Sequence, residues 1–139
     1  MSSPKNNSVE FSLQTQEQKS IVQKPRFRAK PLEVRKKKYN DLMCKSENKN
    51  RLPIICELHQ KSSLNVKTDL KFLTHEKMTL KNFQGSIRKK LSFNDDVVLF
   101  FYNGKTVLKN DQTIGELYRN FKDEDGFLYL QFSEINALG

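Results

Sequence analysis

The spacing of apolar residues divides the 139-residue chain into a polar N-terminal part and a patterned remainder. Residues 1–31 are rich in Ser, Asn, Gln and Lys and contain few large apolar side chains. Such a segment buries too little surface to offset the entropy lost on ordering, so we expect a basic, disordered arm. Pro25 and Pro31 bracket "RFRAK", which we interpret as a hinge. Residues 32–50 carry an imperfect apolar stripe, which predicts a helical extension.

From residue 51 to residue 133 the pattern predicts a single domain of strands and helices. The stretches "RLPIICEL" and "DLKFLTH" indicate two strands, the first with proline at its entry. A helix follows Thr79, a suitable N-cap, because apolar residues then recur at helical spacing on one face. These residues are Leu80, Phe83, Ile87 and Leu91. Gly85 inside this helix indicates either close packing or a looser helix.

The next signals predict a hairpin. Residues 97–102 are continuously apolar, as in a strand buried on both faces. Asn103-Gly104 is a favoured pair for a two-residue turn, and residues 106–108 suit a short return strand.

The last elements complete the order of the fold. Thr113 and Glu116 have the spacing of a capping box at the start of a short helix. Residues 127–132 predict a final strand. The order is that of an α+β, ubiquitin-like β-grasp. We expect a mixed four-stranded sheet with one main helix, one short helix and the N-terminal helical extension.

Charge and cysteine content narrow the classes of function. The formal net charge is +9, and residues 1–38 hold ten Lys or Arg against three Asp or Glu. A basic arm attracts acidic membranes or nucleic acid, and a charge count does not choose between them. We find neither the apolar core of a secretory signal nor a stretch long enough to span a membrane. Two cysteines are too few for a disulfide scaffold, which favours a reduced, intracellular setting.

The residues with reactive side chains do not form a recognisable catalytic pattern. The sequence contains no glycine-rich phosphate loop, no metal-binding Cys or His pair and no nucleophile elbow. We interpret His59 and His75 as surface residues, residues 123–125 as a solvated acidic turn, and Cys56 as a buried structural thiol. We therefore predict that the protein is not an enzyme and holds no metal or cofactor.

Five stretches carry a resemblance to a known family. They are "LPIICE" at 52–57, "KFL" at 71–73, "IRKKL" at 87–91, "FYNGK" at 101–105 and "KDEDGFLYL" at 122–130. Together they resemble the autophagy ubiquitin-like modifiers, the family of autophagy-related protein 8, light chain three and the GABA-receptor-associated protein. The resemblance covers about residues 33–139, and the acidic turn followed by a strand is its most specific part.

The resemblance implies lipid conjugation through Gly139, at the end of a flexible tail of residues 134–139. In this family an E1-like enzyme activates the glycine carboxylate, an E2-like enzyme receives it as a thioester, and phosphatidylethanolamine is the acceptor. A cysteine protease processes and deconjugates the protein. A residue without a side chain passes through narrow catalytic sites and tolerates unusual backbone angles.

The resemblance also implies the setting of the protein. It predicts a monomer that binds cargo receptors and phosphatidylethanolamine membrane, and no nucleic acid. The location implied is the cytoplasm, then the autophagosome membrane, and the vacuole or lysosome.

Peptide docking is the second implied function. Family members bind extended motifs, with an aromatic and an aliphatic residue three apart, along a strand edge. By position, the aromatic pocket would consist of Pro53, Ile55, Leu73 and Phe127, with Lys71 at its rim. The aliphatic pocket would consist of Phe72, Phe83 and Ile87, with Lys90 at its edge. We expect unpaired backbone groups at residues 71–73. Plain core packing is the alternative for Ile55 and Phe83.

Some residues depart from the family pattern, and two other functions stay open. Thr74, His75 and Ser86 replace apolar residues or proline, which predicts a shallower or more polar aliphatic pocket. One alternative is a protein-conjugated modifier of the autophagy-related protein 12 type. The other is a nucleic-acid-binding β-grasp domain that uses the basic arm.

Overall fold

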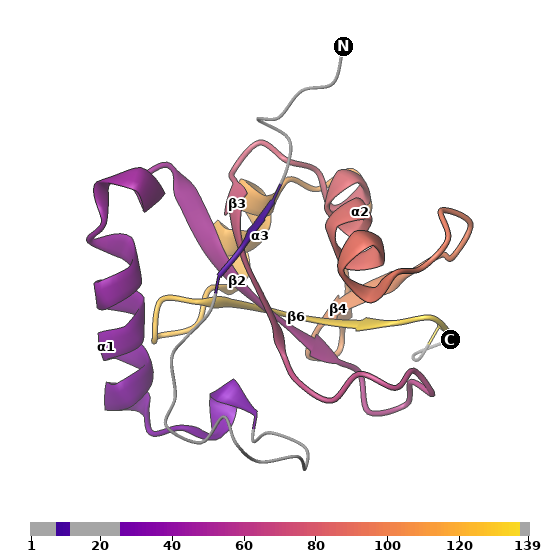
Figure 1. Ribbon diagram of the computed structural model, residues 1–139, viewed down its shortest axis with the longest axis horizontal. Coiled ribbons are helices and arrows are strands. Elements are labelled where there is room, and N and C mark those ends of the chain that lie inside the picture. The colour runs from indigo at the N-terminus through magenta and orange to yellow at the C-terminus, as the bar shows by residue number, and fades with distance from the viewer. Residues whose placement is uncertain (1–7, 12–25, 137–139) are drawn as a thin grey trace.

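The computed structural model describes residues 8–11 and 26–136 (Figure 1). Its strands are β1 (Val9–Glu10), β2 (Arg51–Leu58), β3 (Leu70–His75), β4 (Phe100–Asn103), β5 (Thr106–Val107) and β6 (Leu128–Ser133). Its α-helices are α1 (Leu32–Met43), α2 (Leu80–Leu91) and α3 (Ile114–Phe121). Two short 3-10 helices, η2 (Phe27–Ala29) and η3 (Ser46–Asn48), flank α1.

The strands form one mixed sheet in the order β1-β3-β2-β6-β4-β5. The central strands β2 and β6 are parallel, with Ile54 opposite Leu128, and the other neighbours are antiparallel. The predicted α+β β-grasp is therefore confirmed. The prediction of four strands was wrong for the described residues, because the two-residue strands β1 and β5 extend the sheet at both edges.

The two faces of the sheet bury different sets of residues. Because side chains alternate along a strand, Ile54 and Cys56 face α2 and α3, whereas Ile55 faces the opposite side. The main core lies between the sheet and the helices α2 and α3. Leu80, Phe83 and Ile87 of α2 have no exposed surface, as their helical spacing predicts.

The second face is covered by the N-terminal part of the chain. Figure 1 shows α1 on one side of the molecule and α2 on the other. A smaller cluster of buried residues lies beneath α1, and we refer to it as the Phe127 cluster. Its members are Phe27, Leu42, Ile55, Leu73, Phe127 and Tyr129.

Capping side chains determine where α2 and α3 begin, as predicted. The Thr79 hydroxyl accepts a hydrogen bond from the Asn82 amide at 3.3 Å. Thr113 and Glu116 form a reciprocal capping box at the start of α3. These contacts satisfy backbone donors that have no partner within the helix.

The predicted hairpin differs from the observed one in two details. Strand β4 begins at Phe100 rather than at residue 97, and Val98 is 61% exposed. Asn103 pairs with Thr106, so the two turn residues are Gly104 and Lys105 rather than Asn103-Gly104. Gly104 has a φ of +60°, which suits a residue without a side chain.

Gly85 of α2 lies at an open position. A Cβ built on Gly85 would meet no heavy atom within 4 Å. Close packing therefore does not account for this glycine.

None of the helices in the described ranges has the length and apolar character needed to cross a membrane.

Replacement of Phe83 by alanine tests the core. Phe83 is fully buried and packs against the rings of Phe72 and Phe101. We expect Phe83→Ala to lower the free energy of unfolding by about 3–5 kcal/mol, measured by chemical denaturation. The exposed control Val98→Ala should change it by less than about 0.5 kcal/mol. A loss below about 1 kcal/mol for Phe83→Ala would contradict this assignment to the core.

Candidate functional site

The predicted aromatic-pocket residues lie together on the α1 face of the sheet. Pro53, Ile55 and Leu73 are buried on adjacent strands, and Pro53 is directly opposite Leu73. Phe127, directly before β6, has no exposed surface and belongs to the same cluster as Ile55 and Leu73. Lys71 is partly exposed on β3. The sequence therefore identified residues that lie side by side on this face of the sheet. The four apolar residues among them are buried in the core.

Three aromatic rings from the N-terminal part of the chain already cover Phe127. The Phe27 and Tyr39 rings meet it edge-on, with centroids 5.1 and 5.7 Å away. The Phe11 ring stacks on it at 6.5 Å. The place of the predicted aromatic pocket is therefore filled by the protein's own side chains.

The predicted aliphatic-pocket residues lie on the opposite face of β3. Phe72, Phe83 and Ile87 are buried in the main core, and of these three only Phe72 reaches the surface of the hollow described next. Beside them lies an open hollow of about 650 Å³. Its lining includes Phe72, Gly85, Ser86, Lys89 and Lys90, together with Ser8 and Glu10.

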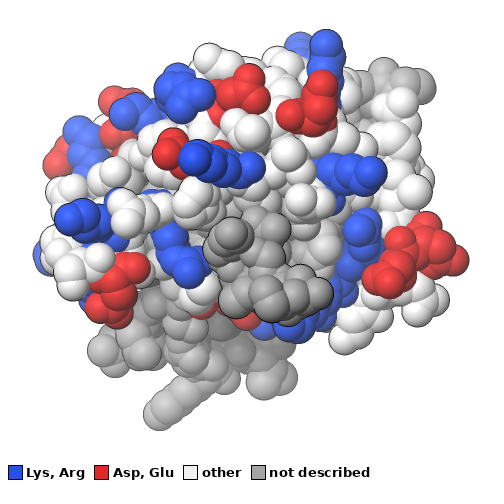
Figure 2. All heavy atoms as spheres, turned by 90° about the horizontal axis from the view of Figure 1, so that it is seen from above, with Lys and Arg blue, Asp and Glu red and all other residues white. Residues whose placement is uncertain are grey.

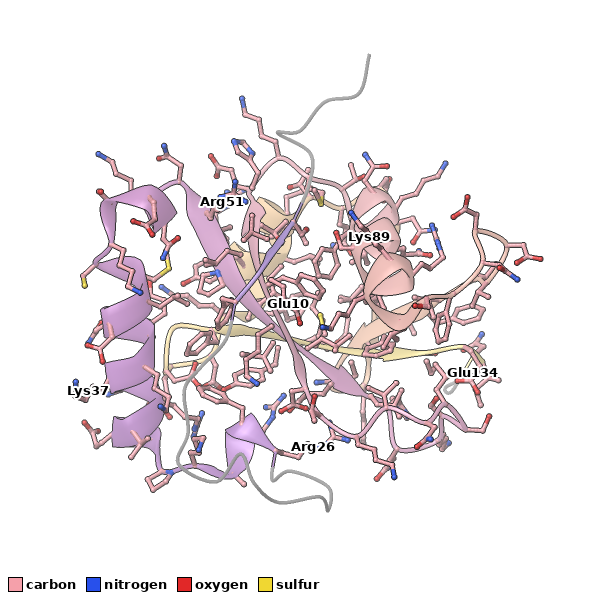
Figure 3. The ribbon with its side chains drawn as sticks, viewed as in Figure 1. Glu10, Arg26, Lys37, Arg51, Lys89 and Glu134 are labelled. Atoms are coloured by element: carbon pink, nitrogen blue, oxygen red, sulfur yellow. The ribbon has the colours of Figure 1, made fainter. Side chains whose placement is uncertain are left out.

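Of the three residues that predicted a more polar pocket, only Ser86 lines the hollow. Thr74 is completely buried, and its hydroxyl donates to Ser8 Oγ at 3.1 Å. His75 lies at the end of β3, where its Nδ1 accepts from the Lys77 amide. Lys90 forms an ion pair with Glu10 at 2.9 Å. In Figure 3, Glu10 and Lys89 mark the two sides of this region.

The edge of β3 is paired, contrary to the prediction of unpaired backbone groups. Strand β1 runs antiparallel to β3, with Val9 opposite Leu73 and Glu10 opposite Phe72. The Phe11 amide donates to the Lys71 carbonyl at 3.1 Å. We use the name docking edge for residues 71–73 of β3 together with the two surfaces beside them. These surfaces are the Phe127 cluster on one side and the hollow on the other.

The prediction of a disordered arm was wrong for residues 8–11 and 26–31, where the chain has defined contacts with the sheet. Residues 8–11 pack on the docking edge, and Phe27 is buried. The remainder of the predicted arm, 1–7 and 12–25, lies outside the described residues. An isolated Phe in a polar stretch carries no periodic signal, and only its tertiary contacts reveal its burial.

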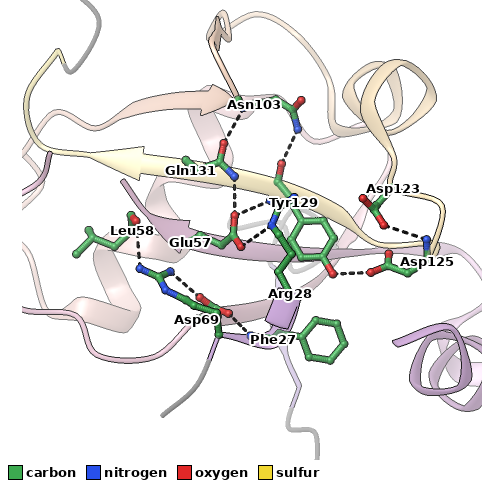
Figure 4. A network of polar contacts seen from close by, with 12 residues as sticks. Phe27, Arg28, Glu57, Leu58, Asp69, Asn103, Asp123, Asp125, Tyr129 and Gln131 are labelled. Atoms are coloured by element: carbon green, nitrogen blue, oxygen red, sulfur yellow. Dashed lines mark hydrogen bonds and ion pairs between the residues drawn. The ribbon is translucent and has the colours of Figure 1, made fainter. Parts of the chain in front are cut away.

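The predicted hinge is a firm attachment built from two arginines and one phenylalanine (Figure 4). Asp69 accepts from Arg26 and from the Phe27 amide, each at 2.8 Å. Arg28 forms two hydrogen bonds with Glu57, at 3.0 and 2.7 Å, and lies 4.1 Å from the centre of the Tyr129 ring. These contacts hold residues 26–28 against the sheet.

Asp125 is buried, so the prediction of a solvated acidic turn was wrong for this residue. Its carboxylate accepts from Arg35 at 2.7 Å, from the Phe127 amide at 2.8 Å and from the Tyr129 hydroxyl at 2.5 Å. Burial and the hydrogen bond to Asp125 raise the pKa of Tyr129, so the hydroxyl stays protonated and donates. Arg35 is therefore largely buried, in an ion pair with Asp125.

The beginning of the C-terminal tail is held by the loop that follows β2. Glu134 accepts hydrogen bonds from the hydroxyls of Ser62 and Ser63, at 2.5 and 2.7 Å. The Ile135 carbonyl accepts from Tyr102 and Ser133. Within the predicted flexible tail, Glu134 and Ile135 therefore have defined contacts with the rest of the protein. Gly139, the predicted conjugation site, lies outside the described residues.

Within the described ranges, no group of three or more His, Cys, Asp and Glu side chains is placed to hold a metal ion. Cys56 is buried as predicted, and burial raises the pKa of its thiol well above the ordinary value. On the face shown in Figure 2, basic and acidic side chains are interspersed rather than gathered by sign.

The central parallel strand pair and the helix α2 across one face define a ubiquitin-like protein of the β-grasp class. Residues 34–139 match the family model described as autophagy protein Atg8, ubiquitin like. The chain therefore belongs to the Atg8 family of ubiquitin-like autophagy proteins.

Relatives and solved structures agree with this family. Autophagy-related protein 8 of Saccharomyces cerevisiae is 32% identical over 91 residues, or 66% of this chain and 78% of the relative. The Candida glabrata protein of that name is 30% identical over 109 residues, which are 78% of this chain and 91% of the relative. Trypanosoma brucei ATG8 is similar in structure, with a TM-score of 0.66, 31% identity and coverage of 77% and 90%. Plasmodium falciparum Atg8, solved with a Plasmodium falciparum Atg3 peptide, has a TM-score of 0.62, 23% identity and coverage of 76% and 92%.

The carboxyl group of Glu134 should titrate at low pH. Burial opposes the ionisation of this carboxyl group, but hydrogen bonds from Ser62 and Ser63 outweigh that effect and lower its pKa to about 2. Because this pKa is depressed below the ordinary value of about 4.3, the contact stabilises the folded state above that pH. Its contribution should disappear as the pH falls through about 2.

Carbon-13 NMR of the Glu134 carboxyl group measures this directly. In the double variant Ser62→Ala and Ser63→Ala, the midpoint should rise toward about 4.3, because the compensating hydroxyl donors are gone. A midpoint that is equal in the wild type and the double variant would contradict the role of the two hydroxyls.

Proposed function

We propose that this protein is a modifier that is conjugated through Gly139 to phosphatidylethanolamine and recruits autophagy factors through short aromatic-x-x-aliphatic motifs. One observation carries the docking part of this proposal. The docking edge pairs with an extended segment, whose aromatic ring packs against Phe127. Main-chain pairing supplies affinity in this mode, and side-chain contacts on the two faces supply specificity.

The conjugation part rests on family membership and on the position of the tail. Strand β6 ends at Ser133, and Ile135 is 46% exposed where the chain leaves the sheet. Gly139 follows, and a glycine carboxylate reaches a narrow catalytic centre without a side chain in the way. Glu134 holds the chain just before that reactive segment.

The partners follow from this chemistry. They are an E1-like and an E2-like enzyme, a processing cysteine protease, cargo receptors and a phosphatidylethanolamine membrane. An Atg8 of the same fold was solved with a peptide of Atg3, although at 23% identity that likeness establishes only the fold. The protein itself would act as a monomeric conjugated modifier rather than as an enzyme. It would be located in the cytoplasm, on autophagosomes, and in the vacuole or lysosome.

Replacement of the C-terminal glycine by alanine tests conjugation. We expect the Gly139→Ala variant to be lipidated slowly or not at all, because a methyl group obstructs the two successive catalytic sites. Reconstitution with the family's E1-like and E2-like enzymes and phosphatidylethanolamine liposomes, followed by mass spectrometry, measures the product. The control Val98→Ala should be lipidated like the wild type, since Val98 is exposed on a loop. Equal rates for Gly139→Ala and the wild type would refute conjugation through this residue.

An acidic peptide of the aromatic-x-x-aliphatic type tests docking. We expect micromolar binding, or about −8 kcal/mol, with NMR shifts in residues 51–55, 71–75 and 83–90. Added salt should weaken binding, because Lys71 and Lys90 attract the acidic groups. The same peptide with alanine in place of its aromatic residue is the control and should bind more weakly. Absence of shifts at millimolar peptide would remove the docking function and leave conjugation standing.

A further inference from the structure

Residues 8–11 occupy the place where an extended partner would pair with the protein. Val9 and Glu10 face Leu73 and Phe72 across the antiparallel pair, and the Phe11 amide donates to the Lys71 carbonyl. Figure 1 shows β1 crossing in front of the sheet beside β3. Only one strand can pair with this edge at a time, because the backbone groups that β3 directs outward, on alternate residues, are already taken by the strand that pairs with them.

The side chains of this segment also use both sides of the docking edge. Ser8 and Glu10 point to the α2 side, where both line the hollow and Glu10 pairs with Lys90. Phe11 points to the other side and stacks on Phe127. The segment thus has the features of a short linear ligand, namely an extended backbone, an aromatic residue and an acidic neighbour.

Apart from the hydrogen bond between Ser8 and the buried Thr74, the contacts of residues 8–11 are peripheral. Glu10 and Lys90 are each more than 40% exposed at the side chain, and exposed ion pairs contribute little stability. Val9 is 44% exposed, and the strand has two residues. Phe27, in contrast, is 3% exposed and is held through its amide by Asp69. The segment can therefore leave while Phe27 and Tyr39 continue to cover Phe127.

We propose that residues 8–11 are an intramolecular ligand of the docking edge, and that a partner's motif binds there by displacing them. This inference rests on the docking function proposed above. Because the competitor belongs to the same chain, its occupancy does not depend on protein concentration. The apparent affinity for a partner is the intrinsic affinity multiplied by the fraction of molecules with a free edge.

The same contacts identify the chemistry of an effective competitor. Glu10 places a carboxylate beside Lys90, and Lys89 lines the same hollow. A partner with an acidic residue in the place of Glu10 re-forms the ion pair with Lys90. An aliphatic residue in that place meets the polar groups of Ser86 and Asn82 instead. We therefore expect selectivity for motifs with an acidic side chain directed toward the hollow.

The test uses the full chain with the double variant Glu10→Lys and Phe11→Ala, and a fluorescein-labelled peptide of sequence Asp-Asp-Phe-Glu-Glu-Leu. The variant reverses the charge next to Lys90 and removes the ring on Phe127. If the segment is docked in about 90% of wild-type molecules, the variant should bind the peptide about 10-fold more tightly in fluorescence anisotropy. An unlabelled peptide of residues 6–13 should then displace the label from the variant.

Matched substitutions control for charge and for loss of apolar surface. Glu47→Lys makes the same charge change at an exposed site in η3, and Val98→Ala shortens an exposed apolar side chain. Both should bind the labelled peptide like the wild type. NMR shifts of the residue 71–73 amides in the free double variant should show that the segment has left, and thermal unfolding should show that the core is intact.

The outcomes separate the two proposals. Tighter binding by the double variant alone supports displacement. Equal binding by the wild type and the double variant overturns displacement and leaves peptide docking standing. If neither protein binds the peptide at millimolar concentration, docking at this edge is refuted together with the displacement that depends on it. Unchanged amides at residues 71–73 would show that residues 8–11 do not occupy the edge in solution, which also overturns the inference.

Discussion

The burial of Phe127 is the constraint on which the arrangement of this protein depends. Its ring belongs to the face of the sheet opposite the main core, where α2 and α3 do not reach. Three rings cover it, and all of them come from residues that precede β2. The extension before the ubiquitin-like domain is thus part of the packing of the sheet. This also means that the docking edge and the N-terminal part of the chain share one apolar surface.

Polar contacts determine where that ring lies. Asp125 accepts from the Phe127 amide and from the Tyr129 hydroxyl, and Arg35 of α1 neutralises its buried charge. Gly126 has a φ of +103°, and a Cβ at this position would come within 2.5 Å of the Tyr39 ring. The motif "KDEDGFLYL" therefore has a structural meaning. It turns the chain beneath α1 and directs Phe127 to the cluster. A lone buried carboxylate is costly, so Arg35 must stay close, which in turn fixes α1 on this face.

The parts of the fold that the sequence predicted are those with local periodic signals. The stripe of α2, the caps at Thr79 and Thr113, and the strands around Ile54 and Leu130 need few long-range contacts to be recognised. Predictions failed where a distant partner decides the outcome. Phe27 is buried where Asp69 binds its amide, and Asp125 is buried where it pairs with Arg35, 90 positions away in sequence. A two-residue strand such as β1 has no period to detect.

The same distinction explains how far the candidate site could be predicted. The apolar residues on the two faces of β3 could be located by position, because neighbouring strands place them together. Whether the backbone groups at the edge of β3 are paired could not be predicted, since it depends on residues 8–11, which are distant in sequence. The two sides of the edge then differ in a way that matters for recognition. Core aromatic rings already fill the side of Phe127, whereas the α2 side keeps an open hollow with serine and lysine at its wall. In the proposed docking mode, an incoming chain gains most of its new polar contacts in that hollow, while on the other side it can only exchange one aromatic ring for another. Discrimination between partners should therefore arise mainly from the α2 side, and the aromatic side should chiefly set the competition with the protein's own Phe11.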